Sequence, residues 1–116
     1  MIDVKVVIKS NLGNILLVKP DYKKTWQLPG GGVENNKSPE QAAIREIKGE
    51  LNLDILVSNL SINGTIYKPV EETLFVIYES NSLITEYTNF NLQADEVIDF
   101  QFTGVQNVAP LLSSYY

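Results

Sequence analysis

Apolar and polar positions alternate along the first part of the chain. Residues Ile2–Ile8 and Ile15–Lys19 are typical of two strands. The turn residues Ser10–Asn14 lie between them and predict an N-terminal hairpin. A brief third strand is expected at Trp26–Leu28, ending at Pro29, which lacks the backbone donor that a ladder needs.

The pattern changes to helical spacing after residue 37. Ser38 is a good N-cap, Pro39 suits the first helical position, and Gln41 completes a capping box. Asn52 is expected to end the helix, because asparagine tolerates the left-handed conformation. The apolar face of this helix is formed by Ala43, Ile44, Ile47 and Leu51.

The second half of the chain is again strand-like. Strands are predicted at Ile55–Leu60, Ile62–Tyr67, Thr73–Glu79 and Val97–Phe102. A short terminal helix is predicted to face the core through Val105, Val108, Leu111 and Leu112. Strands on both sides of one clear helix indicate an α/β or α+β fold with a mixed sheet. The length of 116 residues predicts a single domain over residues 1–116.

Composition narrows the function classes. Hydrophobic residues make up 44% and charged residues 20%, and no apolar run is long enough to span a bilayer. No signal-peptide pattern is seen at the start, and cysteine is absent, which excludes disulfides and thiolate sites, so a cytoplasmic location is expected. A net charge of -5 argues against binding a nucleic-acid polymer. Histidine is absent too, so acid, base or metal chemistry must come from carboxylates.

The acidic residues that can do such chemistry follow a glycine run. Glu46 and Glu50 are four apart, so they project from nearly the same side of the helix. Two carboxylates placed so can share a hard cation such as Mg²⁺ or Mn²⁺, and a carbonyl of the glycine run can complete the coordination. The alternative is structural, since a glutamate pair is often a solvated helix face and a glycine triplet a turn.

Residues Leu28–Leu53, LPGGGVENNKSPEQAAIREIKGELNL, resemble a Nudix box with several letters missing. Gly31 takes the place of the opening glycine. The other matching residues are Arg45, Glu46, Ile47, Glu50 and Leu53. The resemblance implies an α/β/α sandwich with a mixed β-sheet and one principal catalytic helix.

Four departures from the family pattern are specific. Lys37 stands where the family has the glutamate that pairs with the arginine, so Glu34 or Glu40 is expected to order the loop instead. Gly49 stands where the family has a metal-binding glutamate. Asn52 replaces the last glycine of the box, and Asn36 replaces a glycine frequent in relatives.

The resemblance implies a metal-dependent hydrolase that cleaves a diphosphate linkage in a nucleoside diphosphate derivative or nucleotide. Its catalytic residues would be Glu46, Arg45 and Glu50. The metal ligands would be Glu50, Glu46, Gly30 and Glu96, where Glu96 is a second-half acid that compensates for Gly49 and Asp99 is the next choice. Substrate contacts are expected from Lys19, Lys23, Trp26 and Gly31, although Trp26 also suits the core.

The alternative is a catalytically weakened Nudix-fold module that binds a nucleotide or a partner, motivated by Gly49, Lys37 and Asn52. The expected partner is a small nucleotide, with neither a nucleic-acid polymer nor a membrane, and a homodimer is left open. The sequence does not select the substrate.

Overall fold

The computed structural model describes residues 1–20, 25–88, 90, 92 and 97–108, without the side chains of residues 82, 83 and 98. Strands β1 (Ile2–Ser10) and β2 (Ile15–Pro20) form the predicted hairpin. β3 (Gly30–Gly32) follows, and then helix α1 (Pro39–Leu51). The second half contains the 3-10 turn η1 (Val57–Asn59), β4 (Leu60–Lys68), β5 (Thr73–Ile84) and β6 (Val97–Thr103).

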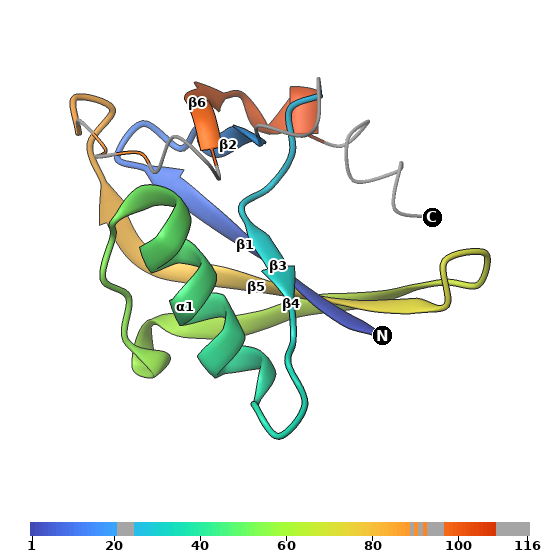
Figure 1. The fold of residues 1–116 in the computed structure, drawn as a ribbon. Coiled ribbons are helices and arrows are strands. Elements are labelled where there is room, and N and C mark those ends of the chain that lie inside the picture. Colours follow the sequence, from blue (N-terminus) through green and yellow to red (C-terminus); the bar gives the residue numbers. More distant parts are fainter. Residues whose placement is uncertain (21–24, 89, 91, 93–96, 109–116) are drawn as a thin grey trace.

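The strands form one mixed sheet in the order β4-β5-β1-β2-β6 (Figure 1). β1 runs parallel to β5, whereas the β4–β5 and β2–β6 pairs are antiparallel. β3 pairs with β1 outside this path. A mixed sheet with one main helix confirms the predicted fold class.

Helix α1 lies across one face of the sheet (Figure 1). Its apolar side, which includes Ala43, Ile47 and Leu51, packs on alternate residues of β1, and this gives one core cluster. A second cluster, with Val7, Leu17 and Phe75 among its members, covers other positions of the same strands. Because side chains alternate along a strand, β1 contributes to both clusters.

The predicted ends of α1 are confirmed. The Ser38 hydroxyl accepts a hydrogen bond from the Gln41 N–H at 3.1 Å, and the Gln41 side chain accepts one from the Ser38 N–H at 3.0 Å. Asn52 closes the helix in the left-handed conformation, with φ 55°.

Two strand predictions are wrong. Gln27 makes an isolated bridge to Val18, and the third strand is formed by the glycine triplet instead of Trp26–Leu28. Residues 55–59 lie outside any strand, because the Asn59 side chain accepts a hydrogen bond from the Leu56 N–H at 3.0 Å and folds the backbone into η1. Ile55 is buried in the core, whereas Leu56 and Val57 are more than half exposed.

The remaining strand predictions hold with longer bounds, since β4, β5 and β6 each contain the predicted segment. Residues 105–108 form one helical turn that buries Val108 but leaves Val105 about half exposed, so the predicted core role of Val105 is wrong. Leu111 and Leu112 lie outside the described residues. Within the described part of the chain, no helix is long and apolar enough to cross a membrane.

Candidate functional site

The glycine strand β3 forms the floor of the candidate site. Gly32, Gly31 and Gly30 pair with residues 3–5 of β1. Gly30 has a φ of +156°, and a Cβ added there would lie 1.9 Å from the Val4 carbonyl oxygen. A side chain therefore has no room at this position, and the backbone packs directly on β1.

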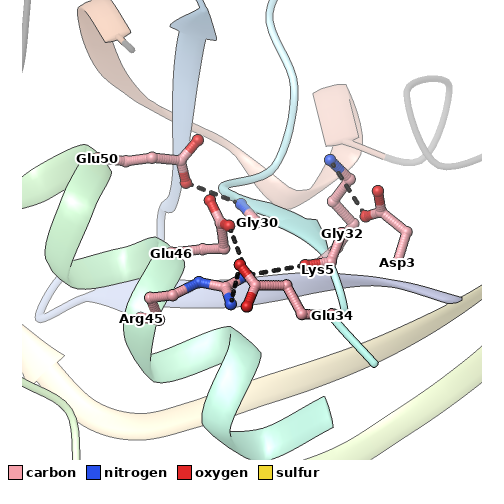
Figure 2. A network of polar contacts seen from close by, with 8 residues as sticks. All are labelled: Asp3, Lys5, Gly30, Gly32, Glu34, Arg45, Glu46 and Glu50. Carbon is pink, nitrogen blue, oxygen red and sulfur yellow. Dashed lines mark hydrogen bonds and ion pairs between the residues drawn. The ribbon is translucent and has the colours of Figure 1, made fainter. Parts of the chain in front are cut away.

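Helix α1 places two carboxylates against this floor. The Gly30 N–H donates a hydrogen bond to Oε1 of Glu50 at 2.9 Å. A Cβ on Gly31 would lie 2.5 Å from Cδ of Glu46 and 2.7 Å from its Oε2. Figure 2 shows both carboxylates turned toward the glycine strand. Glu50 is only 8% exposed, and a buried carboxylate needs such a backbone donor.

Arg45 ties the loop to the helix. Its Nη2 donates to the Gly32 carbonyl at 2.9 Å and lies 3.0 Å from Oε1 of Glu46 (Figure 2). Its Nη1 lies 3.0 Å from Oε1 of Glu34. Glu34 thus pairs with the arginine, as expected from the presence of Lys37 at the position of the family's glutamate.

Glu40, the other acid considered for that role, has a different partner. Its Oε1 accepts a hydrogen bond from the buried Tyr78 hydroxyl at 2.7 Å, which joins the first turn of α1 to β5. This bond lowers the pKa of Glu40 below its usual value. Burial, and next the same bond, raise the pKa of the Tyr78 phenol. Glu40 therefore serves to dock the helix.

Two departures from the box have a backbone explanation. Asn36 and Asn52 both adopt positive φ, at 67° and 55°. These are the positions where the family places glycine, and asparagine is among the residues that tolerate this conformation best. The glycine losses therefore leave the backbone path intact. Gly49 is different, because a metal-binding side chain is missing there.

The donors at the site are of the right kind for a hard cation. Glu46 and Glu50 offer carboxylate oxygens beside a glycine backbone, as Mg²⁺ prefers. Among the described residues, no three acidic side chains form a group that could hold a metal. Glu96, the expected further ligand, lies outside those residues. Asp99 is exposed and accepts a hydrogen bond from the neighbouring Phe100 N–H at 2.8 Å.

Of the expected substrate residues, Gly31 lies in the floor of the site, whereas Lys19 and Trp26 contact each other. Nζ of Lys19 lies 6.0 Å from the centre of the Trp26 ring, in cation–π range. Trp26 is partly buried against the second core cluster, in keeping with its core role. Lys23 lies outside the described residues. The structure therefore brings together Arg45, Glu46, Glu50 and the glycines, but it records no contact between them and Lys19.

A charged pair on β1 was not predicted from the sequence. Lys5, whose neighbour across the ladder is Gly30, is only 7% exposed, and its Nζ lies 3.7 Å from Oδ1 of Asp3. Figure 2 shows this pair beside β3. The signal was present as polar residues at alternate positions of an otherwise apolar strand.

The sequence and the fold have known relatives. The model of the NUDIX domain matches residues 1–114. An RNA pyrophosphohydrolase of Vibrio cholerae is 38% identical over 70 residues, which cover 58% of this chain and 41% of the relative. That of Pasteurella multocida is 28% identical over 114 residues, 84% of this chain and 57% of the relative. The chain thus spans at most 57% of the length of these two relatives.

The fold comparison agrees. The crystal structure of a MutT protein from Methanosarcina mazei superposes with a TM-score of 0.77 at 19% identity, covering 95% of this chain and 80% of the other. At this identity the likeness concerns the fold. The family model covers nearly the whole sequence, and the residues of the box lie together in space. The chain therefore belongs to the Nudix family.

Proposed function

We propose that this protein is a metal-dependent pyrophosphohydrolase that cleaves a diphosphate linkage in a nucleotide or nucleoside diphosphate derivative. The observation that carries the proposal is the Gly30 N–H bond to Glu50 at 2.9 Å, next to a Glu46 carboxylate packed on Gly31. A solvated glutamate pair would not be held against a glycine strand in this way.

Nudix proteins generally use divalent metals such as Mg²⁺. In this chain the ligands would be Glu50, Glu46, the Gly30 carbonyl and Glu96. When bound, such a metal neutralises phosphate charge and lowers the pKa of a bound water. An Mg²⁺ or Mn²⁺ requirement also fits the net charge of -5, since phosphate would otherwise be repelled.

The protein groups around this site have positioning roles. The Gly30 N–H fixes the direction of the Glu50 carboxylate, and Arg45 holds Glu46 and the Gly32 carbonyl in place. Gly31 leaves the space that Glu46 occupies. We propose that Lys19, Lys23 and Trp26 contact the phosphates or the base of the nucleotide.

The substrate class follows from the relatives only as a proposal. Curated relatives are named RNA pyrophosphohydrolases, and one solved structure of similar fold is a bifunctional NMN adenylyltransferase/ADP ribose pyrophosphatase. A substrate panel therefore needs nucleoside triphosphates, ADP-ribose, dinucleoside polyphosphates and a 5′-triphosphate RNA. The expectation that nucleic-acid polymers do not bind stays a prediction that this panel tests.

The decisive experiment compares wild type with Glu50→Gln across this panel, with Mg²⁺, Mn²⁺ or a chelator. Glutamine keeps an oxygen that can accept the Gly30 N–H bond but removes the charge, so we expect a fall in turnover of about 100-fold or more. Glu71→Gln is the control, because Glu71 pairs with Lys68 at the β4–β5 turn. No product from any substrate in a folded preparation contradicts the proposal.

A second candidate is a nucleotide-binding module with little or no activity, and Gly49 is the observation that favours it. Nucleotide affinity that is unchanged by Mg²⁺, by a chelator and by the variant Glu50→Gln would support this candidate. The variant Gly49→Glu restores the family's ligand. If the missing ligand limits the enzyme, we expect its turnover to rise about tenfold or more, whereas unchanged turnover means that another acid such as Glu96 fills the role.

A further inference from the structure

A pocket opens beside the candidate site at the start of α1. It has a volume of about 190 Å³ and is lined by Lys37, Gln41 and Arg45. These residues are spaced four apart, so Gln41 and Arg45 share one face of the helix and Lys37 precedes that face in the loop. All three side chains are exposed, which leaves the pocket open to a ligand from solvent.

Two residues of the pocket, Lys37 and Gln41, offer hydrogen-bond donors, whereas Arg45 already contacts Glu34, Glu46 and the Gly32 carbonyl. Lys37 has no ion-pair partner recorded within the described part of the chain, and its ammonium offers three donors. The Gln41 carbonyl oxygen is already engaged by the Ser38 N–H at 3.0 Å. The amide nitrogen of Gln41 can therefore donate hydrogen bonds to a ligand. A ligand that suits this lining is an anion with several acceptor oxygens.

The position of Lys37 reverses the charge expected there. The Nudix box carries a glutamate at this place, whereas here Glu34 pairs with Arg45 at 3.0 Å. Lys37 is therefore not needed to order the loop through its side chain. Arg45 links the pocket to the candidate site, since it lines the pocket and also lies 3.0 Å from Glu46.

We propose that the pocket of Lys37, Gln41 and Arg45 binds a phosphate group of a polyphosphate ligand, beyond the diphosphate held at Glu46 and Glu50. Its role in catalysis rests on the proposed function, whereas the binding of phosphate does not. Ligands with an additional phosphate, such as triphosphates or dinucleoside polyphosphates, would gain from this contact, and shorter diphosphate derivatives would not.

Binding is tested first without a metal. Inorganic tripolyphosphate is titrated into ¹⁵N-labelled wild type, Lys37→Gln and Lys48→Gln in EDTA, at low and high salt. Lys48 is the matched control, because it lies on the same helix but pairs with Asp54 at 3.2 Å and does not line the pocket. We expect amide shifts at residues 37, 41 and 45, and a dissociation constant about two- to fivefold higher in Lys37→Gln.

The effect of Lys37 should shrink at high salt, because exposed charges are screened. Equal affinity in wild type and Lys37→Gln overturns the inference, as does an equal loss in Lys48→Gln or a set of shifts elsewhere in the protein. Thermal unfolding of each variant shows that it is folded, so that a lost affinity is assigned to the pocket.

Turnover then separates this inference from the proposed function. In the presence of Mg²⁺, we expect Lys37→Gln to lower kcat/KM for a triphosphate about two- to fivefold more than for ADP-ribose. If no substrate is cleaved but Lys37-dependent tripolyphosphate binding is found, the hydrolase proposal fails and the pocket stands. If cleavage is normal and the variant shows no preference change or binding loss, the pocket fails and the hydrolase stands.

Discussion

The glycine run predicts three different outcomes for three neighbouring alanine substitutions. In Gly31→Ala the new Cβ would lie 2.5 Å from Cδ of Glu46, whereas ordinary contact begins at 3.4 Å. Glu46 must therefore move by about 0.9 Å. Its side chain is 25% exposed and flexible, so it can turn away without disturbing the core.

The two consequences of that movement differ in size. The Arg45–Glu46 pair is partly exposed, and its loss costs about 1 kcal/mol or less of stability. A displacement of about 1 Å in a catalytic group, by contrast, can cost about 100-fold in rate. We therefore expect Gly31→Ala to stay folded, to lose about 100-fold in Mg²⁺-dependent turnover and to bind Mn²⁺ more weakly.

The flanking glycines provide the comparison. A Cβ on Gly32 meets nothing within 4 Å, so Gly32→Ala should retain both stability and turnover. A Cβ on Gly30 would lie 1.9 Å from the backbone oxygen of Val4. Gly30→Ala should therefore lower the free energy of unfolding. Urea unfolding, Mn²⁺ titration and turnover of the three variants are the assays.

Wild-type turnover and Mn²⁺ affinity in Gly31→Ala would contradict the predicted displacement of Glu46. An equal loss of turnover and Mn²⁺ affinity in Gly32→Ala would contradict it too, because that loss would not come from the displacement of Glu46. If the protein is not a hydrolase, the Mn²⁺ titration still tests the geometry.

Further predictions concern contacts around the site. Tyr78→Phe should cost about 1 kcal/mol in urea unfolding through the lost bond to Glu40. Because the pKa of Tyr78 is raised in the folded protein, the phenol of the unfolded chain loses its proton first above about pH 10, and the stability of the wild type falls there. The stability of Tyr78→Phe should fall less over the same range. Equal falls in the two proteins would contradict this prediction. Asn52→Ala should lose about 1–2 kcal/mol, because alanine is strained at φ 55°; an unchanged melting temperature would refute that strain. Glu34→Gln should cost less than about 1 kcal/mol, since Glu34 is 67% exposed, and the cost should shrink in high salt; a salt-independent loss would mean that Glu34 has another role.

Local signals in the sequence predicted the helix and its site residues. Ser38, Pro39, Gln41 and Asn52 are chemical signals for helix ends, and each appears in the structure as expected. Helical spacing placed Glu46 and Glu50 on one side of the helix, and the resemblance to the Nudix box assigned them to the site. Glu34 was one of two acids considered for Arg45, and three-dimensional contacts were needed to choose it, because Glu40 lies close enough to Tyr78 to bond with it.

The errors have tertiary causes. The segment 55–59 has strand-forming residues, but the Asn59 side chain bonds to the backbone and turns the chain. A glycine triplet has low strand propensity, so β3 was missed; it forms because β1 offers a ladder and the absent side chains allow close approach. The pocket at Lys37 was not predicted either, because it depends on how the loop brings Lys37 beside Gln41 and Arg45.

The position of β1 between β3 and β5 has a consequence for folding kinetics. The described part of the site lies within residues 30–50, which are close in sequence. Its strand β3, however, pairs with residues 3–5 of β1, at the start of the chain. The same three residues of β1 pair in parallel with residues 75–77 of β5, some seventy residues further along the chain. Pairings of such separation form slowly. During synthesis α1 emerges well before β5, which pairs with the strand that supports β3. The proposed metal site should therefore form late, at the rate at which the sheet closes.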